Sequence, residues 1–215
     1  MLNHIAEYDF IAGEMLAIHK PLTWTSFNVV SRVRGMLKRK LHQKLKVGHA
    51  GTLDPLAEGL LIICTGKFTK KIDTYQAQEK EYTGTFCIGA TTPCYDLEKP
   101  VDAHFPVSHI TDEAIYAATK EFTGTIQQVP PQFSAIKVDG KRAYDVARAG
   151  GDTVLKAREI EITVFEITRI AREAETIAVD FRVECSKGTY IRSLARDFGV
   201  TLGSGAYLTA LCRTR

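Results

Sequence analysis

The stretch VGHAGTLDPLAEGL, residues 47–60, contains a single aspartate, Asp54, whose carboxylate could do covalent chemistry. Pro55 favours extended backbone at the residue before it, and Gly51 permits a sharp turn just upstream. An isolated Asp-Pro pair is most often an Asx-type turn that leads into a strand. Asp54, however, follows a basic segment that would attract an anionic substrate. We find no obvious second carboxylate beside it and no metal-ligand spacing, so the chemical interpretation is a single carboxylate acting as nucleophile.

The basic segment before Asp54 has positive charges that no acidic residue offsets. Such a run is usually a solvated helix face. Its side chains repel one another unless an anion neutralises them, and phosphates would do so with a strong dependence on salt. The residues concerned are Arg32, Arg34, Lys38, Arg39, Lys40, Lys44 and Lys46.

Two residues further along the chain are candidates for the same site. Tyr82 lies in KEYTG beside Lys80; an aromatic residue at the start of a strand is usually part of the core, but it can also stack on a base. Arg192 lies opposite the apolar face of a predicted helix, where an arginine is ordinarily solvated. If it were buried against Asp54, it would keep that carboxylate ionised.

Composition limits the classes of protein to consider. The 215 residues suit one domain, or one domain with a lobe, and the net charge of +3 gives a weak overall field. The five cysteines include no C-x-x-C pair, which indicates reduced thiols. The six histidines lack ligand spacing, and no nucleotide-binding glycine motif is present, so we expect neither metal nor cofactor. With no signal peptide and no spanning segment, we expect a soluble cytoplasmic protein without membrane contact.

The elements that must position these residues follow from hydrophobic periodicity. More strands than helices are expected, mostly joined as hairpins, which predicts an α+β fold on a mixed or antiparallel sheet. Helices are predicted from Ser26 as a cap, with Phe27, Val30, Val33, Leu37 and Leu41 inward, over 111–122 with Ile115, Ala118 and Phe122 inward, and from Ile191 with Leu194, Ala195 and Phe198 inward. Strands are predicted over 14–21, 60–64, 81–91, 160–164 and 177–185, with a turn at 172–175 and a loop-like stretch over 124–151 that ends in a short helix.

Several segments resemble one known family. GHAGTLDPLAEGLL closely resembles the catalytic motif of the bacterial TruB family of tRNA pseudouridine synthases. Four other segments match further elements of that family, in family order and over nearly the whole chain. HKPLTWTS resembles its NKPxGxTS element, KEYTG its tyrosine segment, VPPQFSAIKVDGKRAYDVARAG its PPxYSAxKxxGxxxYExAR loop, and CSKGTYIRSLARDFG its GTYIRxLxxDxG element.

The resemblance implies a fold and an activity. It implies one pseudouridine-synthase catalytic domain over residues 1–215, with a long curved sheet, mixed but mostly antiparallel, flanked by helices. A thumb-like loop over about 124–151 would grip RNA. The implied reaction converts uridine to pseudouridine at position 55 in the TΨC loop of tRNA, without cofactor or metal. The implied partner is the TΨC arm of tRNA, with a monomeric enzyme that requires no protein partner.

The resemblance also assigns residues. Asp54 matches the catalytic aspartate, Tyr82 the tyrosine that stacks on the target base, and Arg192 the arginine paired with the aspartate. The remaining matches line the nucleotide pocket (His49, Tyr190 and Leu211) or are basic positions of the cleft (Lys20 and Lys70). The attack by Asp54 could be at C1′ or at C6, or the carboxylate could remove a sugar proton to give a glycal.

The chain departs from the family pattern at three places. It ends at Arg215, where many bacterial relatives continue into an RNA-binding barrel of the PUA type, so we expect a short form without that barrel. Pro93 and Cys94 stand where relatives more often have polar residues, although Asp96 still matches, and Phe133 replaces a tyrosine. Two alternatives remain open: a guide-RNA-dependent, dyskerin-like synthase, and a non-catalytic module that binds or folds tRNA.

Overall fold

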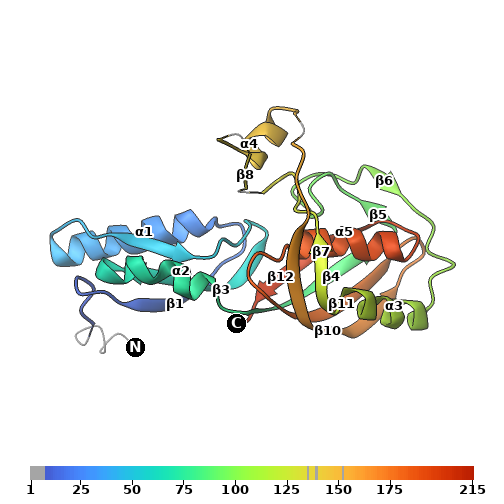
Figure 1. Cartoon of the computed structure of the whole chain (residues 1–215), viewed down its shortest axis with the longest axis horizontal. Coiled ribbons are helices and arrows are strands. Elements are labelled where there is room, and N and C mark those ends of the chain that lie inside the picture. Colours follow the sequence, from blue (N-terminus) through green and yellow to red (C-terminus); the bar gives the residue numbers. More distant parts are fainter. Residues whose placement is uncertain (1–7, 135, 139, 152) are drawn as a thin grey trace. The chain divides into compact units, whose positions relative to one another are not determined.

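A computed structural model of the chain describes residues 8–134, 136–138, 140–151 and 153–215. The chain divides into two compact units (Figure 1). Unit 1 consists of residues 1–79 and 212–215, and unit 2 consists of residues 80–211. Two residues of the predicted thumb-like loop, Ala135 and Asp139, lie outside the described residues.

Unit 1 is built on three antiparallel strands and one long helix. The buried, nearly continuous apolar strand β3 (Ala57–Thr65) pairs with β1 (Met15–Lys20) and with β2 (Val47–Ala50). Helix α1 (Ser26–Leu41) packs its apolar side on these strands, and the short η2 (Gly66–Lys71) and α2 (Ile72–Gln76) follow β3. The core of unit 1 contains Phe10, Val29, Val30, Leu37, Val47, Leu61 and Ile63.

Helix α1 begins one residue earlier than predicted, and its buried face is rotated. Thr25, not Ser26, is the N-cap, since the Thr25 hydroxyl accepts from the Asn28 N–H at 3.0 Å while Asn28 Oδ1 accepts from the Thr25 N–H at 2.8 Å. The prediction that Phe27 points inward is wrong, because its side chain is 62% exposed. Val29 is buried in its place and forms the buried apolar face of the helix together with Val30 and Leu37.

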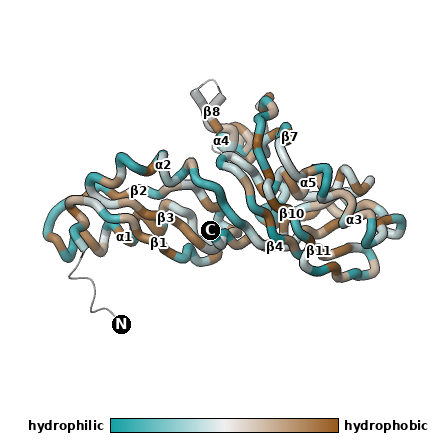
Figure 2. Tube along the Cα trace, turned by 60° about the horizontal axis from the view of Figure 1, so that its bottom comes forward, coloured by the Kyte–Doolittle hydropathy of each residue, from teal (hydrophilic) through white to brown (hydrophobic). Residues whose placement is uncertain are grey.

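Unit 2 is an antiparallel sheet covered by helix α5 (Ile191–Thr201). Its strand order is β12-β4-β11-β10-β7, and the last two residues of β12 belong to unit 1. Residues alternate between buried and half-buried along β11, and Figure 2 shows hydrophobic and hydrophilic positions recurring in turn along β10 and β11. The strands are β4 (Lys80–Ile88), β7 (Gly124–Gln128), β10 (Arg158–Arg172), β11 (Ile177–Cys185) and β12 (Ala206–Arg213).

Aromatic rings fill the space between this sheet and α5. Phe86 on β4 stacks on Phe181 of β11 with ring centroids 4.2 Å apart, and Phe165 of β10 lies 5.3 Å from Phe198 of α5. A register shift between Ile162 and Val164 interrupts the predicted alternation of β10, so that Phe165 becomes buried. The predicted inner face of α5 is confirmed, since Ile191, Leu194, Ala195 and Phe198 are all buried.

Smaller elements complete unit 2, and some of them were not predicted. The stretch predicted as loop-like begins with strand β7, which pairs with β10 and forms the edge of the unit 2 sheet. Strands β2 and β12 and helix α2 were also missed. The α+β class and the mostly antiparallel sheet are confirmed. The remaining elements are β5 (Ala90–Thr91), β6 (Ala103–His104), α3 (Asp112–Thr119), η3 (Lys120–Phe122), β8 (Lys137–Val138), β9 (Lys141–Arg142) and α4 (Ala143–Arg148).

Candidate functional site

Asp54 lies in the turn that joins β2 to β3 in unit 1. Gly51 adopts φ +94°, a left-handed conformation that side chains disfavour, and this starts the turn. The Asp54 carbonyl accepts from the Ala57 N–H at 3.1 Å, which closes the turn before β3 begins. The Asp54 side chain is half-buried. The local sequence therefore forms the predicted turn, and it holds the carboxylate at a strand entrance.

The first turn of α1 is tied to this loop by Ser26. The Ser26 hydroxyl donates to the Leu53 carbonyl at 3.2 Å and accepts from the Leu53 N–H at 2.9 Å. Both residues are buried, so these two bonds satisfy backbone groups that would otherwise be costly to leave unpaired. The helix start therefore fixes the residue directly before Asp54.

Lys20 holds the same loop from the other side. Its side chain is completely buried, and its ammonium donates to the carbonyls of Pro21, at 3.0 Å, of Trp24, and of Pro55, at 3.5 Å. Burial lowers the pKa of Lys20, and the negative charges of Asp54 and Glu58 oppose that shift. Lys20 was predicted as a basic residue of the cleft. In the structure, its buried ammonium bonds backbone carbonyls and joins the β1–α1 loop to Pro55.

His49 is another ionisable group in unit 1. Burial lowers its pKa, a hydrogen bond with the Gly51 backbone opposes the shift, and the nearby charge of Arg213 adds to it. The neutral imidazole is therefore favoured. Its Nδ1 is buried and has no hydrogen-bond partner among the described residues.

Arg213 was not singled out from the sequence, yet it supports the site. It is buried, and its guanidinium donates to the carbonyls of Leu60, at 2.6 Å, and Gly51, at 3.3 Å. The last residues of the chain thus bind both ends of the β2–β3 turn. Its position 153 residues after Leu60 gives no local sequence signal for this contact.

Arg192 in unit 2 is buried, so the solvated position expected by default is wrong. Its side chain is 7% exposed and forms an ion pair with Asp96, with 3.5 Å between Nε and Oδ2. The guanidinium also donates to the carbonyls of Cys94, at 3.2 Å, and Phe133, at 2.9 Å. Arg192 therefore joins helix α5 to two loops, one of which begins the predicted thumb.

The other predicted residues of unit 2 surround the start of α5 or lie on the sheet. Tyr190 is the N-cap of α5, and its backbone N–H and carbonyl bond the buried amide of Gln128 at 2.8 and 3.2 Å. Tyr82 is on β4 opposite Val183, and both it and Leu211 are buried. Gln128 was not predicted, because it lies in the stretch taken for a loop.

The predicted site residues thus form two groups. Asp54, His49 and Lys20 are brought together in unit 1, where Lys70 lies exposed on η2. The group in unit 2 consists of Tyr82, Tyr190, Arg192 and Leu211. The pairing of Asp54 with Arg192 joins different units and stays a prediction.

Metal-binding clusters and membrane-spanning helices are absent from the part of the chain that the structure describes. Across the described ranges, no cluster of three or more histidine, cysteine, aspartate or glutamate side chains is arranged to hold a metal ion. Within the same part of the chain, no helix is both long and apolar enough to cross a membrane. All five cysteines are free.

An α+β sheet, a carboxylate held in a rigid turn and a basic helix beside it are typical of an enzyme that modifies RNA. Residues 38–191 match the model of the TruB family pseudouridylate synthase (N terminal domain). The chain belongs to this family of pseudouridylate synthases. It is 56% identical over 208 residues to tRNA pseudouridine synthase B of Parabacteroides distasonis, covering 96% of this chain and 87% of the relative. The same protein of Flavobacterium johnsoniae is 56% identical over 209 residues, covering 96% and 90%.

Solved structures agree with the fold. A chain in the crystal structure of a Cbf5-Nop10-Gar1 complex is similar with a TM-score of 0.68 at 29% identity. A chain in the structure of an H/ACA RNP bound to a substrate RNA containing 2′-deoxyuridine is similar with a TM-score of 0.64 at 27% identity. Both matches cover 96% of this chain, which spans about half the length of those chains.

Proposed function

We propose that this protein isomerises uridine 55 in the TΨC loop of tRNA to pseudouridine, with Asp54 as the nucleophile. The observation that carries the proposal is the fixed Asp54 loop, which Ser26 and the buried ammonium of Lys20 hold from two sides. A preorganised carboxylate of this kind reacts without first paying for loop ordering. The substrate class is supported by relatives over 50% identical that carry the name tRNA pseudouridine synthase B.

The reaction needs no group beyond the protein and the nucleotide. The N1–C1′ bond breaks, the uracil ring turns, C5 bonds to C1′, and the C5 proton passes to solvent while N1 gains one. Asp54 begins this sequence by attacking C1′ or C6, or by removing a sugar proton. Each of these three steps uses the ionised carboxylate.

The remaining residues bind and orient the nucleotide. A uridine must leave its stack to react, at a cost of a few kcal/mol, and the Tyr82 ring would offset part of this by stacking on the base. His49 would line the nucleotide pocket, with its imidazole in the neutral form that burial favours. Arg192 would place a positive charge near the reacting carboxylate, with its own charge balanced by Asp96.

The enzyme would act alone on bare tRNA, as a monomer, through one catalytic domain. The solved neighbours come from protein complexes, so the competing hypothesis is a guide-RNA-dependent synthase. Turnover of an unmodified tRNA transcript by purified protein separates the two. Activity only after addition of guide RNA and partner proteins would contradict the stand-alone proposal.

Release of tritium from tRNA that contains C5-tritiated uridine tests the reaction itself. Wild-type protein should release tritium from position 55, and Asp54→Asn should reduce release to background while its thermal unfolding stays cooperative. Asp73→Asn, which changes an exposed carboxylate on α2 of the same unit, should keep wild-type activity. A wild-type protein that releases no tritium would contradict the enzyme proposal, and an active Asp54→Asn would contradict the assigned nucleophile.

A further inference from the structure

The excess of positive over negative charge in this protein is confined to unit 1. Unit 1 contains thirteen lysines and arginines against seven acidic residues, whereas unit 2 contains fifteen against eighteen. Between residues 32 and 71 there are ten basic and two acidic residues. This segment contains most of α1 and all of β2, β3 and η2. An anionic polymer would therefore be attracted to unit 1 and not to the chain as a whole.

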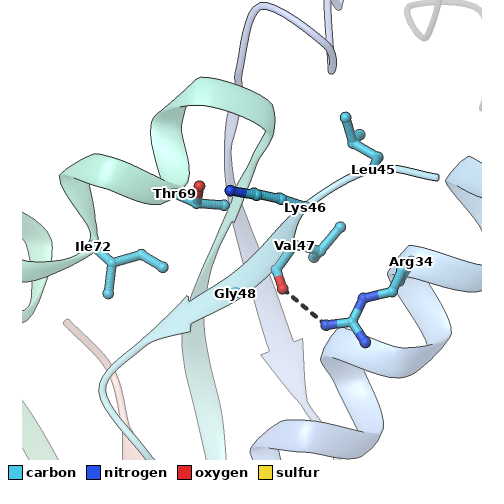
Figure 3. A pocket seen from close by; sticks show the side chains of 7 residues that line it. All are labelled: Arg34, Leu45, Lys46, Val47, Gly48, Thr69 and Ile72. Carbon is cyan, nitrogen blue, oxygen red and sulfur yellow. Dashed lines mark hydrogen bonds between the residues drawn. The ribbon is translucent and has the colours of Figure 1, made fainter.

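A pocket of about 440 Å³ opens within this basic segment (Figure 3). Its walls come from α1, the chain leading into β2, and the η2–α2 region. Two cations line it, and none of the described residues that line it is acidic. The lining residues are Arg34, Leu45, Lys46, Val47, Gly48, Thr69 and Ile72.

Arg34 is held in place at the rim of the pocket. Its guanidinium donates to the Val47 carbonyl at 3.0 Å and lies over the ring of Phe27, with 5.9 Å from Cζ to the centroid. The bond to Val47 uses one of five guanidinium donors, which leaves a fixed positive charge directed at the pocket. Figure 3 shows Arg34 and Lys46 approaching it from different elements.

The other lining residues give the pocket its shape. Gly48 has no side chain, and a Cβ there would lie 2.7 Å from Ile72 Cδ1, so glycine allows α2 to pack close to β2. The Thr69 hydroxyl donates to the Gly66 carbonyl at 2.8 Å, so the two cations are the groups left to bind an anion. Leu45 and Ile72 offer apolar surface. A phosphate with the sugar attached to it matches this combination of charge and apolar wall.

We propose that this pocket binds a backbone phosphate of the RNA substrate, away from the target nucleotide, through Lys46 and Arg34. The inference rests on the proposed function for the identity of the RNA. Gly48 and Asp54 are six residues apart, so their Cα atoms are at most about 20 Å from each other. The phosphate therefore belongs to the same arm of the RNA as the reacting uridine.

The test measures the binding of a TΨC stem-loop RNA, by its Kd and by the slope of log Kd against log salt concentration. Lys46→Gln should weaken binding about fivefold to tenfold and reduce the slope by about one. Lys46→Arg, which keeps the charge, should stay within about twofold of wild type. The matched control is Lys67→Gln, an exposed lysine on the same basic segment that does not line the pocket, and it should also change Kd less than about twofold.

Kinetics distinguish a failure of this inference from a failure of the proposed function. At saturating RNA, Lys46→Gln should release tritium with the wild-type kcat, because only binding is changed. If wild type releases no tritium, the proposed function fails first. If wild type is active but Lys46→Gln and Lys67→Gln weaken RNA binding equally, the pocket has no specific phosphate and the inference is overturned. A normal Kd for Lys46→Gln likewise overturns it.

Discussion

Thr23 has a backbone conformation that threonine rarely adopts. Its φ is +69°, in the left-handed region, and its N–H donates to the Pro55 carbonyl at 2.8 Å. In the family element NKPxGxTS, the corresponding position is glycine, which adopts this φ without strain. The β1–α1 loop of this chain therefore keeps its connection to the Asp54 turn at the expense of local backbone strain.

Replacing Thr23 with glycine should stabilise the protein. Removing the β-branched side chain relieves about 1–2 kcal/mol of strain, of which the extra entropy of the unfolded glycine cancels part, so we expect a gain of about 0.5–1 kcal/mol. Urea denaturation measures it as an increased midpoint with an unchanged slope. Thr52→Gly is the control, because Thr52 is exposed and not among the residues with positive φ, and it should lower stability. A Thr23→Gly midpoint at or below that of wild type would contradict the strain argument.

The local structure around individual candidate residues could be predicted from the sequence, but their contacts with distant parts of the chain could not. The glycine before Asp54 and the proline after it predict its turn, and the family motif assigns its role. Burial of Arg192 against Asp96 was not predictable, since the two residues are 96 positions apart and helical periodicity places Arg192 on the solvent side. The hydrogen-bond partners of Lys20 could not be predicted from the sequence either. Its three carbonyl partners include Pro55, which only the folded chain brings near.

Helix α1 contributes more to the site through its first turn than through its basic residues. Ser26 makes two hydrogen bonds with Leu53, the residue before Asp54. From the sequence, Ser26 was predicted as the helix cap, a role that Thr25 fills. The periodicity located the helix but could not show which of two adjacent hydroxyl residues caps it. Ser26 does not cap the helix because its hydroxyl bonds Leu53, which lies 27 residues further along the chain.

Ser26→Ala should therefore reduce both stability and turnover. Loss of the hydroxyl leaves the buried Leu53 N–H and carbonyl without their partner, which costs about 1–3 kcal/mol of unfolding free energy. The loop that carries Asp54 loses one of its attachments, so kcat should fall more than KM rises. The exposed Ser31 on the same helix gives the control, since Ser31→Ala should leave turnover unchanged and stability equal or slightly higher. A Ser26→Ala variant with wild-type kcat would show that α1 does not position Asp54.

Strand prediction failed where pairing depended on distant partners. Gly124–Gln128 was taken as loop because it is short and polar, yet it pairs with β10 at the edge of the unit 2 sheet. The alternating strands of the β10–β11 hairpin were predicted, because adjacent strands joined by a short turn carry their pairing signal locally. The bulge after Ile162 was not predicted, because it accompanies the packing of Phe165 on Phe198, which is distant in sequence.

At the scale of the whole molecule, the distribution of charge matters more than its total. A net charge of +3 predicts only weak attraction to RNA, but unit 1 alone has an excess of six positive charges, and unit 2 an excess of three negative charges. Binding to RNA should depend on the local field of unit 1. The composition summed over the chain hides this asymmetry, although the run of basic residues before Asp54 reveals part of it.

Two variants with the same total charge test this. Replacing Lys38, Arg39 and Lys40 of α1 with glutamine, or replacing the exposed Lys99, Lys120 and Lys156 of unit 2 with glutamine, each lowers the net charge from +3 to zero. The α1 variant should raise KM for tRNA about tenfold at low salt and flatten the dependence of KM on salt, with kcat unchanged at saturating tRNA. The unit 2 variant should keep the wild-type salt dependence. Equal changes in KM for the two variants would mean that total charge, and not the basic surface of unit 1, determines RNA binding.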